Sequence, residues 1–313
     1  MKLTVIIPVF NESESIPELL NELEVVLDVY ESWEVLFIDD GSSDGSTGFM
    51  RTACKKNKNI KLIQLYRNFG KSAALNEGFK LASGDYVITM DADLQDDPKE
   101  IHNLINKIDE GWDLVSGWKK TRLDPLNKRI PSKLFNFVTR IISGVKIHDF
   151  NCGLKGYKKA VVKSIEIYGG RHRYIPAIVG QQKFKVTEIV VNHRSRKYGE
   201  TKYGGSRILH GFFDLITILF LNKYTQQPLH LFGTIGIFFS TGGVLSEFLV
   251  LYYKYNLGEP FSKHIALLMF GIMLIVIGIQ FFSIGLLAEL LTKSTQNQEK
   301  RIRDFHNINF KNI

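Results

Sequence analysis

Short apolar runs alternate with segments of helical spacing along most of the chain. Between the first two runs, leucine and valine side chains recur at helical spacing, and we expect a helix that begins at Ser13 or Ser15 and ends near Tyr30. A second helix is expected over Ser72–Ala82. The expected strands are Leu3–Pro8, Glu34–Ile38, Lys61–Tyr66, a run that ends at Met90, Trp112–Gly117 and Val186–Val191. This alternation predicts βαβ units and an α/β fold with a mostly parallel sheet.

The pattern is looser between the last two of these strands. Residues Trp118–Lys133 are basic and rich in turn formers, which fits either a solvated loop or a mobile clamp for phosphate groups. Helical spacing returns over Ser132–Ile142, and a further carboxylate, Asp149, precedes a strand-like segment. We therefore expect one more helix in this region.

Near the C-terminus the alternating pattern gives way to two long apolar runs, Leu229–Tyr253 and His264–Leu291. Each is long enough to span a bilayer, and the alternative is a pair of buried core helices. Lysine and arginine residues crowd the outer flanks of the two runs, and this positive-inside bias places both ends in the cytoplasm. Glu247 then lies within the membrane, and we expect it to face the other helix or the protein.

The composition shift divides the chain into four expected regions. An α/β domain covers residues 1–205, and an amphipathic, aromatic-rich segment over 206–227 is suited to the membrane interface. A two-helix transmembrane hairpin covers 228–292, and a polar tail over 293–313 is expected in the cytoplasm. No signal peptide precedes the first strand, so the α/β domain is also expected on the cytoplasmic side.

Charge narrows the range of partners. The chain has 313 residues, a formal net charge of +8 and a pI near 9.2, which suits an anionic substrate or an anionic membrane surface. We find no nucleic-acid-binding signature. The two cysteines, Cys54 and Cys152, are too few for a disulfide framework and lack the spacing of metal ligands, so we expect two reduced thiols.

Two carboxylates, Asp91 and Asp93, follow the apolar run that ends at Met90. At the carboxyl end of a strand they lie where open α/β sheets bind ligands. Two close carboxylates repel each other unless a cation lies between them, and Mg²⁺ or Mn²⁺ binds such oxygen ligands together with substrate phosphates. An isolated Asp-x-Asp is more often a solvated turn, so the assignment depends on the motifs that accompany it.

Five motifs, in order along the chain, resemble those of a known enzyme family. They are Pro8-Val9-Phe10-Asn11-Glu12, Asp39–Ser46, Asn68-Phe69-Gly70-Lys71, Asp91–Gln95 and Arg196–Gly204, the last with Thr201 where serine is usual. The chain resembles the GT-A-fold glycosyltransferases of family two. More narrowly, it is similar to their polyprenyl-phosphate branch, which includes dolichyl-phosphate mannose synthase and the bactoprenol glucosyltransferases. The resemblance covers roughly residues 1–205, and the two-helix tail fits the bactoprenol type.

The resemblance implies roles for individual residues. The residues expected to hold the nucleotide are Pro8, Phe10, Glu12, Ile38 and Asp40, with Asp40 at the edge of the base. The residues expected at the rest of the donor are Asp91, Ala92, Asp93 and Lys119. The expected ligands of Mg²⁺ or Mn²⁺ are Asp91, Asp93 and Gln95, and the expected acceptor-phosphate residues are Arg129, Arg196 and Lys202. Asp149 falls at the position of the catalytic carboxylate, although a helix or turn cap is the alternative role.

The implied reaction is an inverting transfer of a sugar from a nucleotide-sugar to a polyprenyl phosphate at the cytoplasmic membrane face. The two-helix tail favours a UDP-hexose donor over GDP-mannose, and Asp40 does not decide the base. A phosphate monoester is mostly dianionic at neutral pH, so Asp149 is expected to orient the acceptor and take a residual proton. The alternatives are a processive polysaccharide synthase, a membrane scaffold without activity and a soluble nucleotide-sugar pyrophosphorylase. A homo-oligomer is left open.

Overall fold

The computed structural model describes residues 2–120, 126–195, 197–198 and 227–296. The chain divides into two compact units, Met1–Leu215 and Ile216–Ile313. The first unit contains the sheet, and the second contains two long helices. The expected interfacial segment over 206–227 lies outside the described residues except for Gln227.

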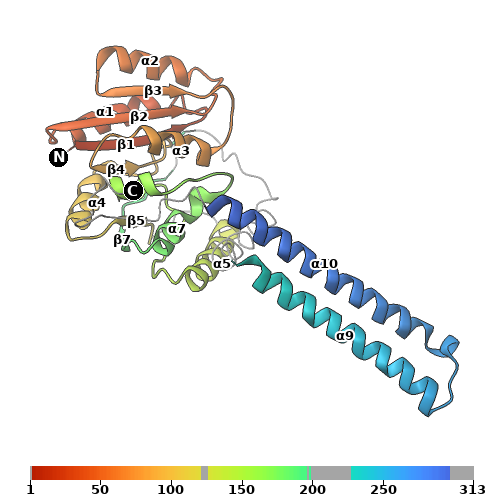
Figure 1. Ribbon diagram of the computed structural model, residues 1–313. Helices are drawn as coiled ribbons and strands as arrows, with labels where there is room; N and C mark the ends of the chain where they lie inside the picture. Colours follow the sequence, from red (N-terminus) through yellow and green to blue (C-terminus); the bar gives the residue numbers. More distant parts are fainter. Residues whose placement is uncertain (1, 121–125, 196, 199–226, 297–313) are drawn as a thin grey trace, which may run out of the picture. The chain divides into compact units, whose positions relative to one another are not determined.

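A seven-stranded sheet forms the centre of the first unit, in the order β3-β2-β1-β4-β6-β5-β7. The strands are β1 (Lys2–Val9), β2 (Ser32–Asp39), β3 (Ile60–Gln64), β4 (Tyr86–Thr89), β5 (Leu114–Trp118), β6 (Lys155–Lys158) and β7 (Val186–Val190). In Figure 1 the sheet extends from β3, near the top of the view, to β7 below. Only β6 runs antiparallel to its neighbours, β4 and β5, so the predicted mostly parallel sheet is confirmed.

Helices cover both faces of this sheet. They are α1 (Ile16–Leu27), α2 (Ser46–Lys56), α3 (Lys71–Leu81), α4 (Glu100–Asp109), α5 (Leu126–Ser143), α6 (Lys159–Ser164) and α7 (Ile175–Gln181), with a 3₁₀ turn η1 over Arg171–Tyr174. Side chains of β1 alternate between the faces, because successive residues of a strand point in opposite directions. Leu3, Val5 and Ile7 pack with α1, α2 and α4, whereas Ile6 packs with α3, α6 and α7.

Two local expectations differ from the structure. The basic stretch that begins at Trp118 is not a loop as far as Lys133, because α5 begins at Leu126 and runs through Pro131. Apolar residues recur at every fourth position from Leu126, and this spacing continues the helix on the N-terminal side of Pro131, ahead of the expected range Ser132–Ile142. Ser15 does occupy the N-cap of α1, but its Oγ donates to the carbonyl of Glu12 at 3.0 Å and makes no cap bond.

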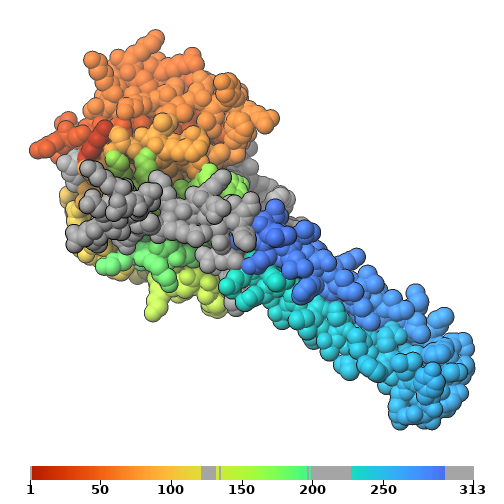
Figure 2. Space-filling model, viewed as in Figure 1, coloured from red at the N-terminus to blue at the C-terminus, as the bar shows by residue number. Residues whose placement is uncertain are grey.

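The second unit contains α9 (Pro228–Asn256) and α10 (Ile265–Gln296), with a 3₁₀ turn η2 (Phe261–His264) between them. Both helices are long and apolar enough to cross a membrane, and only 17% and 11% of their most apolar windows are buried in the structure. Core helices of a soluble protein would be mostly buried, so this exposure favours the expected membrane hairpin. Figure 2 shows α9, in cyan, against α10, in blue.

The contact between α9 and α10 accommodates the acidic residues of the hairpin. Gly243 lies so close to α10 that a Cβ there would be 2.6 Å from the carbonyl oxygen of Gly271. Glu247 faces α10 at Gly271, as expected for a carboxyl group within the membrane. Glu289 accepts a hydrogen bond from the N–H of Leu229 at 3.3 Å, and it thereby satisfies one donor at the first turn of α9.

Candidate active site

The carboxyl ends of β1, β2 and β4 meet at one edge of the sheet. The parallel register pairs Val9 with Asp39 and Ile6 with Thr89, so the loops after these strands begin side by side. Pro8 and Ile38, both expected at the nucleotide, are neighbours in this register. The edge is the ligand-binding side of an open α/β sheet.

The loops after β1 and β2 are joined by hydrogen bonds. Asn11, in the left-handed region at φ 54°, accepts from the N–H of Ser43 at 2.8 Å and donates its own N–H to Ser42 Oγ at 3.0 Å. The N–H of Glu12 donates to Ser46 Oγ at 2.9 Å. Phe10 and Glu12 are therefore part of a loop whose backbone is fixed from both sides.

Asp40 is buried, and both of its carboxylate oxygens accept backbone hydrogen bonds. Phe69 N–H donates to Oδ1 at 2.7 Å and Gly70 N–H donates to Oδ2 at 2.9 Å. Burial raises the pKa of Asp40, the two N–H groups oppose that shift, and the neighbouring Asp39 adds to it. The carboxylate thus fixes the loop that leads into α3, while a role toward the base stays a prediction.

Asp91 follows β4 and forms an ion pair with Lys71, the first residue of α3. Burial alone would raise the pKa of Asp91, but the ammonium of Lys71, with Lys119 and Lys155, lowers it to about 2. The Asp91 carboxylate packs against Gly153, where a Cβ would lie 2.5 Å from Oδ2. Asp91 is therefore an anion at neutral pH with one cation already beside it.

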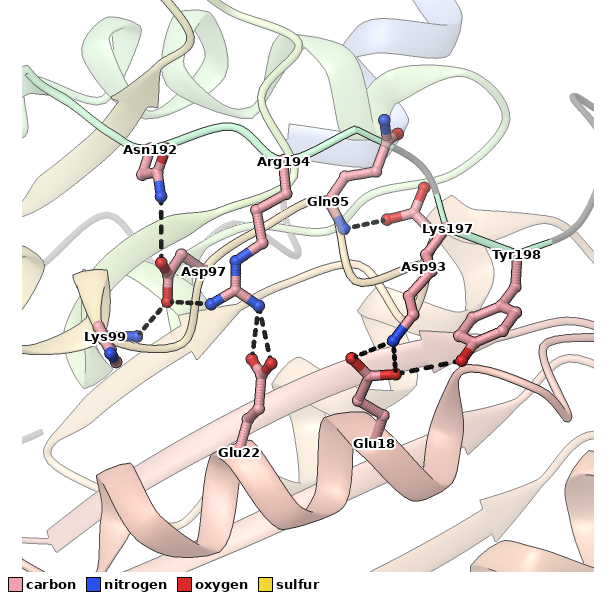
Figure 3. A network of polar contacts seen from close by, with 10 residues as sticks. All are labelled: Glu18, Glu22, Asp93, Gln95, Asp97, Lys99, Asn192, Arg194, Lys197 and Tyr198. Carbon is pink, nitrogen blue, oxygen red and sulfur yellow. Dashed lines mark hydrogen bonds and ion pairs between the residues drawn. The ribbon is translucent and has the colours of Figure 1, made fainter.

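Asp93 has a different electrostatic environment. Burial, followed by repulsion from Asp91 and Asp96, raises its pKa to about 6. Its Oδ1 accepts a hydrogen bond from the backbone N–H of Gln95 at 3.2 Å, and Figure 3 shows the side-chain amide of Gln95 extending away from that contact. Ala92, between the two carboxylates, is buried in the core.

The chemistry of Asp91 and Asp93 fits a divalent cation. Both offer hard oxygen donors, and a cation between them would relieve the repulsion from Asp91 that, after burial, raises the pKa of Asp93. Within the described ranges, no group of three His, Cys, Asp or Glu side chains is arranged to hold a metal. A donor diphosphate and water are further oxygen ligands that Mg²⁺ or Mn²⁺ takes in such sites.

Of the expected phosphate-binding cations, Lys119 is the one whose side-chain contacts the structure describes. Lys119 follows β5, and its Nζ lies 2.8 Å from Asp96 Oδ1. Burial opposes the charged form, but Asp96 holds the pKa of Lys119 above its ordinary value. Arg129 belongs to α5, and Arg196 and Lys202 lie outside the described residues.

Asp149 is buried, with 1% of its surface exposed. Its Oδ1 accepts a hydrogen bond from the N–H of Asn151 at 3.1 Å, and Ser116 Oγ donates to its carbonyl at 3.2 Å. The first contact is a turn cap, which was the alternative role for this residue. Its expected role as the catalytic carboxylate stays a prediction.

Three residues near the Asp91 carboxylate received no role from the sequence. Lys71 and Gly153 flank Asp91, and Lys155 is 3% exposed and donates to the carbonyl of Cys152. With Asn151 and His172 they line a cavity of about 10 Å³, roughly the size of one water molecule. Lys71 ends one of the recognised motifs, and the available signal for Lys155 was a lysine at the start of the strand-like segment after Asp149.

The cysteines behave as expected. Cys54 and Cys152 are free thiols, and Cys152 is buried. Burial raises the pKa of Cys152 to about 12, so its thiol stays protonated at neutral pH.

Two relatives match nearly the whole chain. A dodecaprenyl-phosphate galacturonate synthase of Rhizobium johnstonii is 33% identical over 303 residues, covering 94% of this chain and 88% of the relative. An undecaprenyl-phosphate 4-deoxy-4-formamido-L-arabinose transferase of Salmonella choleraesuis is 34% identical over 306 residues, covering 97% of this chain and 92% of the relative. Both matches are long enough to include the apolar helices as well as the sheet.

Solved structures share the fold of the first unit. A glucosyl-3-phosphoglycerate synthase of Mycobacterium tuberculosis, in complex with Mn²⁺ and UDP-glucose, has a TM-score of 0.55 at 16% identity, covering 71% of this chain and 78% of that chain. The same enzyme with phosphoglyceric acid has a TM-score of 0.57 at 16% identity, with coverage of 72% and 82%. At this identity the likeness concerns the fold alone, and it agrees with the GT-A architecture expected from the motifs.

A family model described as glycosyl transferase family 2 matches residues 4–166, from β1 to just past the end of α6. This range contains the carboxylates of the sheet edge and the cations beside them. With the relatives above, the match shows that the chain belongs to glycosyl transferase family 2.

Proposed function

We propose that this protein transfers a sugar from a nucleotide-sugar to a polyprenyl phosphate and so makes a polyprenyl-phosphate sugar. The observation that carries the proposal is the near-complete match to two relatives named for this reaction, a match that includes the hairpin. The paired carboxylates at the sheet edge support it, because a nucleotide-sugar donor presents a diphosphate to a divalent cation. The two apolar helices support a lipid-borne acceptor.

Asp91 and Asp93 would hold Mg²⁺ or Mn²⁺ together with the donor diphosphate. When bound, such an ion acts as a Lewis acid that stabilises the leaving nucleoside diphosphate. Lys71 and Lys119 supply further positive charge beside Asp91 and Asp96. Because each ammonium already has a carboxylate partner, the site keeps these cations in place before a diphosphate arrives.

The acceptor phosphate is the nucleophile. Its second pKa is near 6, so at neutral pH it carries two charges and needs little deprotonation. An acceptor oxygen forms a bond to the anomeric carbon on the face opposite the leaving diphosphate, whose bond to that carbon breaks, and the configuration inverts. Asp149 orients the acceptor and takes the proton of the monoanionic fraction, while Arg129, Arg196 and Lys202 bind the acceptor phosphate.

The donor that we favour is a UDP-hexose, with Pro8, Phe10, Glu12, Ile38 and Asp40 around its nucleotide. The two-helix hairpin motivates this choice over GDP-mannose. The catalytic unit and both ends of the hairpin are assigned to the cytoplasmic side, because lysine and arginine residues flank the outer ends of both helices.

A lipid-extraction assay tests the proposal. Membranes that contain the protein are incubated with a panel of labelled nucleotide-sugars, polyprenyl phosphate and Mn²⁺ or Mg²⁺, and the lipid is then extracted. We expect a labelled lipid-phosphate sugar that disappears with excess EDTA and in Asp91→Ala or Asp93→Ala. Asp28→Asn, an exposed carboxylate at the end of α1, is the matched control and retains activity. Label in a polymer, or full activity in EDTA, would overturn the proposed reaction or its metal dependence respectively.

A further inference from the structure

The chain after β7 lies along the loop that follows the two metal-site carboxylates. We call residues 192–195, 197 and 198 the post-β7 segment. The backbone N–H of Arg194 donates to the backbone carbonyl of Gln95 at 3.0 Å, and His193 forms an isolated antiparallel bridge with Asp96. Asn192 donates from its side chain to Asp97 Oδ2 at 3.2 Å, as Figure 3 shows. The segment therefore contacts three successive residues of this loop.

The guanidinium of Arg194 joins that loop to α1. Nη1 lies 2.8 Å and 2.7 Å from the two carboxylate oxygens of Glu22, and Nη2 lies 2.9 Å from Asp97 Oδ1 (Figure 3). The Arg194 side chain is 31% exposed, so water screens these contacts only in part. A planar guanidinium suits two carboxylates at once, which the point charge of a lysine does not.

A second ion pair on the same segment provides a natural comparison. Lys197 Nζ lies 2.9 Å and 2.7 Å from the oxygens of Glu18, which also accepts from Tyr198 Oη at 3.3 Å. Glu18 is one helical turn before Glu22 on α1, and its pair with Lys197 is more exposed. Exposed pairs contribute little, and this one does not reach the loop after β4.

The backbone of Gln95 connects Arg194 to Asp93. Its carbonyl accepts from Arg194, and its N–H donates to Asp93 Oδ1 at 3.2 Å. Asp93 is repelled by Asp91 and Asp96, and the Gln95 N–H is a donor that favours one orientation of its carboxylate. Arg196 and Lys202, the expected acceptor cations, follow Arg194 along the sequence.

We infer that Arg194 is a positioning residue that holds the Gln95 backbone, and through it the Asp93 carboxylate, in the orientation required at the donor diphosphate. It acts through Glu22 and Asp97 and touches neither substrate. The inference rests on the proposed function, because Asp93 is assigned to the metal and donor there. It adds that the donor site depends on the segment that leads to the acceptor cations.

The test compares two glutamates of α1. Glu22→Gln removes the charge of one of the two carboxylate partners of Arg194, and Glu18→Gln removes the charge of the partner of Lys197 one turn away. Arg194→Gln and Arg194→Lys complete the set, the first without charge and the second with charge but without the planar fork. The readouts on the full-length protein are hydrogen–deuterium exchange over residues 93–98, calorimetric binding of Mn²⁺ with UDP, and the KM and kcat for the donor.

Loss of a charge-assisted contact changes an equilibrium constant by roughly tenfold or more. We expect Arg194→Gln to speed exchange over 93–98 and to weaken Mn²⁺–UDP binding, each by about tenfold. The donor KM should rise more than kcat falls, Arg194→Lys and Glu22→Gln should be intermediate, and Glu18→Gln should match the wild type.

Wild-type exchange and wild-type Mn²⁺–UDP affinity in both Arg194→Gln and Glu22→Gln would overturn the inference. Equal effects of Glu18→Gln and Glu22→Gln would also overturn it, since they would indicate a general loosening of α1. If Arg194→Gln does not fold, Glu22→Gln carries the same comparison. Failure of the wild type to transfer sugar to lipid would refute the proposed function alone, because exchange and Mn²⁺–UDP binding do not require the acceptor.

Discussion

A methyl group at position 153 would press against the carboxylate that we assign to the metal. In Gly153→Ala the new Cβ would lie 2.5 Å from Asp91 Oδ2, 2.7 Å from Cγ and 2.9 Å from Oδ1. Ordinary van der Waals contact begins at 3.4 Å, so the carboxylate must withdraw by about 0.9 Å. These three nearest atoms all belong to the side chain of Asp91.

Gly153→Ala is expected to lower stability slightly and the rate of transfer strongly. The Asp91 side chain is 32% exposed, so it has room to turn toward solvent, and we expect a loss of about 1 kcal/mol in stability. A displacement of about 1 Å at a reacting centre lowers the rate by roughly 100-fold. Gly153→Ala is therefore expected to fold and to lose about two orders of magnitude in kcat/KM for the donor.

The assay measures lipid-sugar formation at saturating Mn²⁺ together with a thermal melt of the same sample. Gly48→Ala is the control, because its Cβ would meet nothing within 4 Å in the helix α2, and alanine there should stabilise by about 0.5–1 kcal/mol without changing the rate. If Gly153→Ala kept kcat/KM within threefold of the wild type, the assignment of Asp91 to the donor site would be refuted.

Three further predictions concern acid stability, the catalytic carboxylate and topology. Burial opposes ionisation of Glu34, but hydrogen bonds from Lys61, Ser83 and Thr4 lower its pKa from 4.5 to about 2. This depressed pKa contributes about 3 kcal/mol to the free energy of unfolding above pH 4.5, and the contribution is lost as pH falls toward 2. The free energy of unfolding of Glu34→Gln, measured with denaturant, should therefore depend less on pH than that of the wild type over this range. Parallel curves for the two proteins would contradict the shift. Asp149→Asn should lose most activity at pH 6 and recover in part by pH 8, as the acceptor dianion forms; a constant deficit in the pH–rate profile would reject the dianion as nucleophile. A cysteine in place of the exposed Leu257, between α9 and η2, should react with an impermeant maleimide added outside the cell. A cysteine in place of Asp28 should not react, and its labelling would exclude the cytoplasmic assignment of the first unit.

The sequence by itself determined the fold class of the first unit and the two long helices of the second. Alternating apolar runs and helical spacing report burial and period directly, so the strand order along the chain and the position of Asp91 and Asp93 at the end of β4 followed from local pattern. Length and apolar content determined the two long helices in the same way. Boundaries moved where a local signal was ambiguous, as at Pro131, which α5 includes.

Only the tertiary structure decided which side chains meet at the site. Lys71 reaches Asp91 across 20 positions of sequence, and Arg194 reaches Glu22 across 172. Gly153 lies against Asp91 because β6 enters the sheet antiparallel between β4 and β5, a pairing that no local period encodes. Hydrophobic periodicity records how each residue faces the core, whereas contacts between polar groups depend on register and loop geometry. The sequence therefore determined the position of the carboxylates, and the packing of distant segments determined their charge partners.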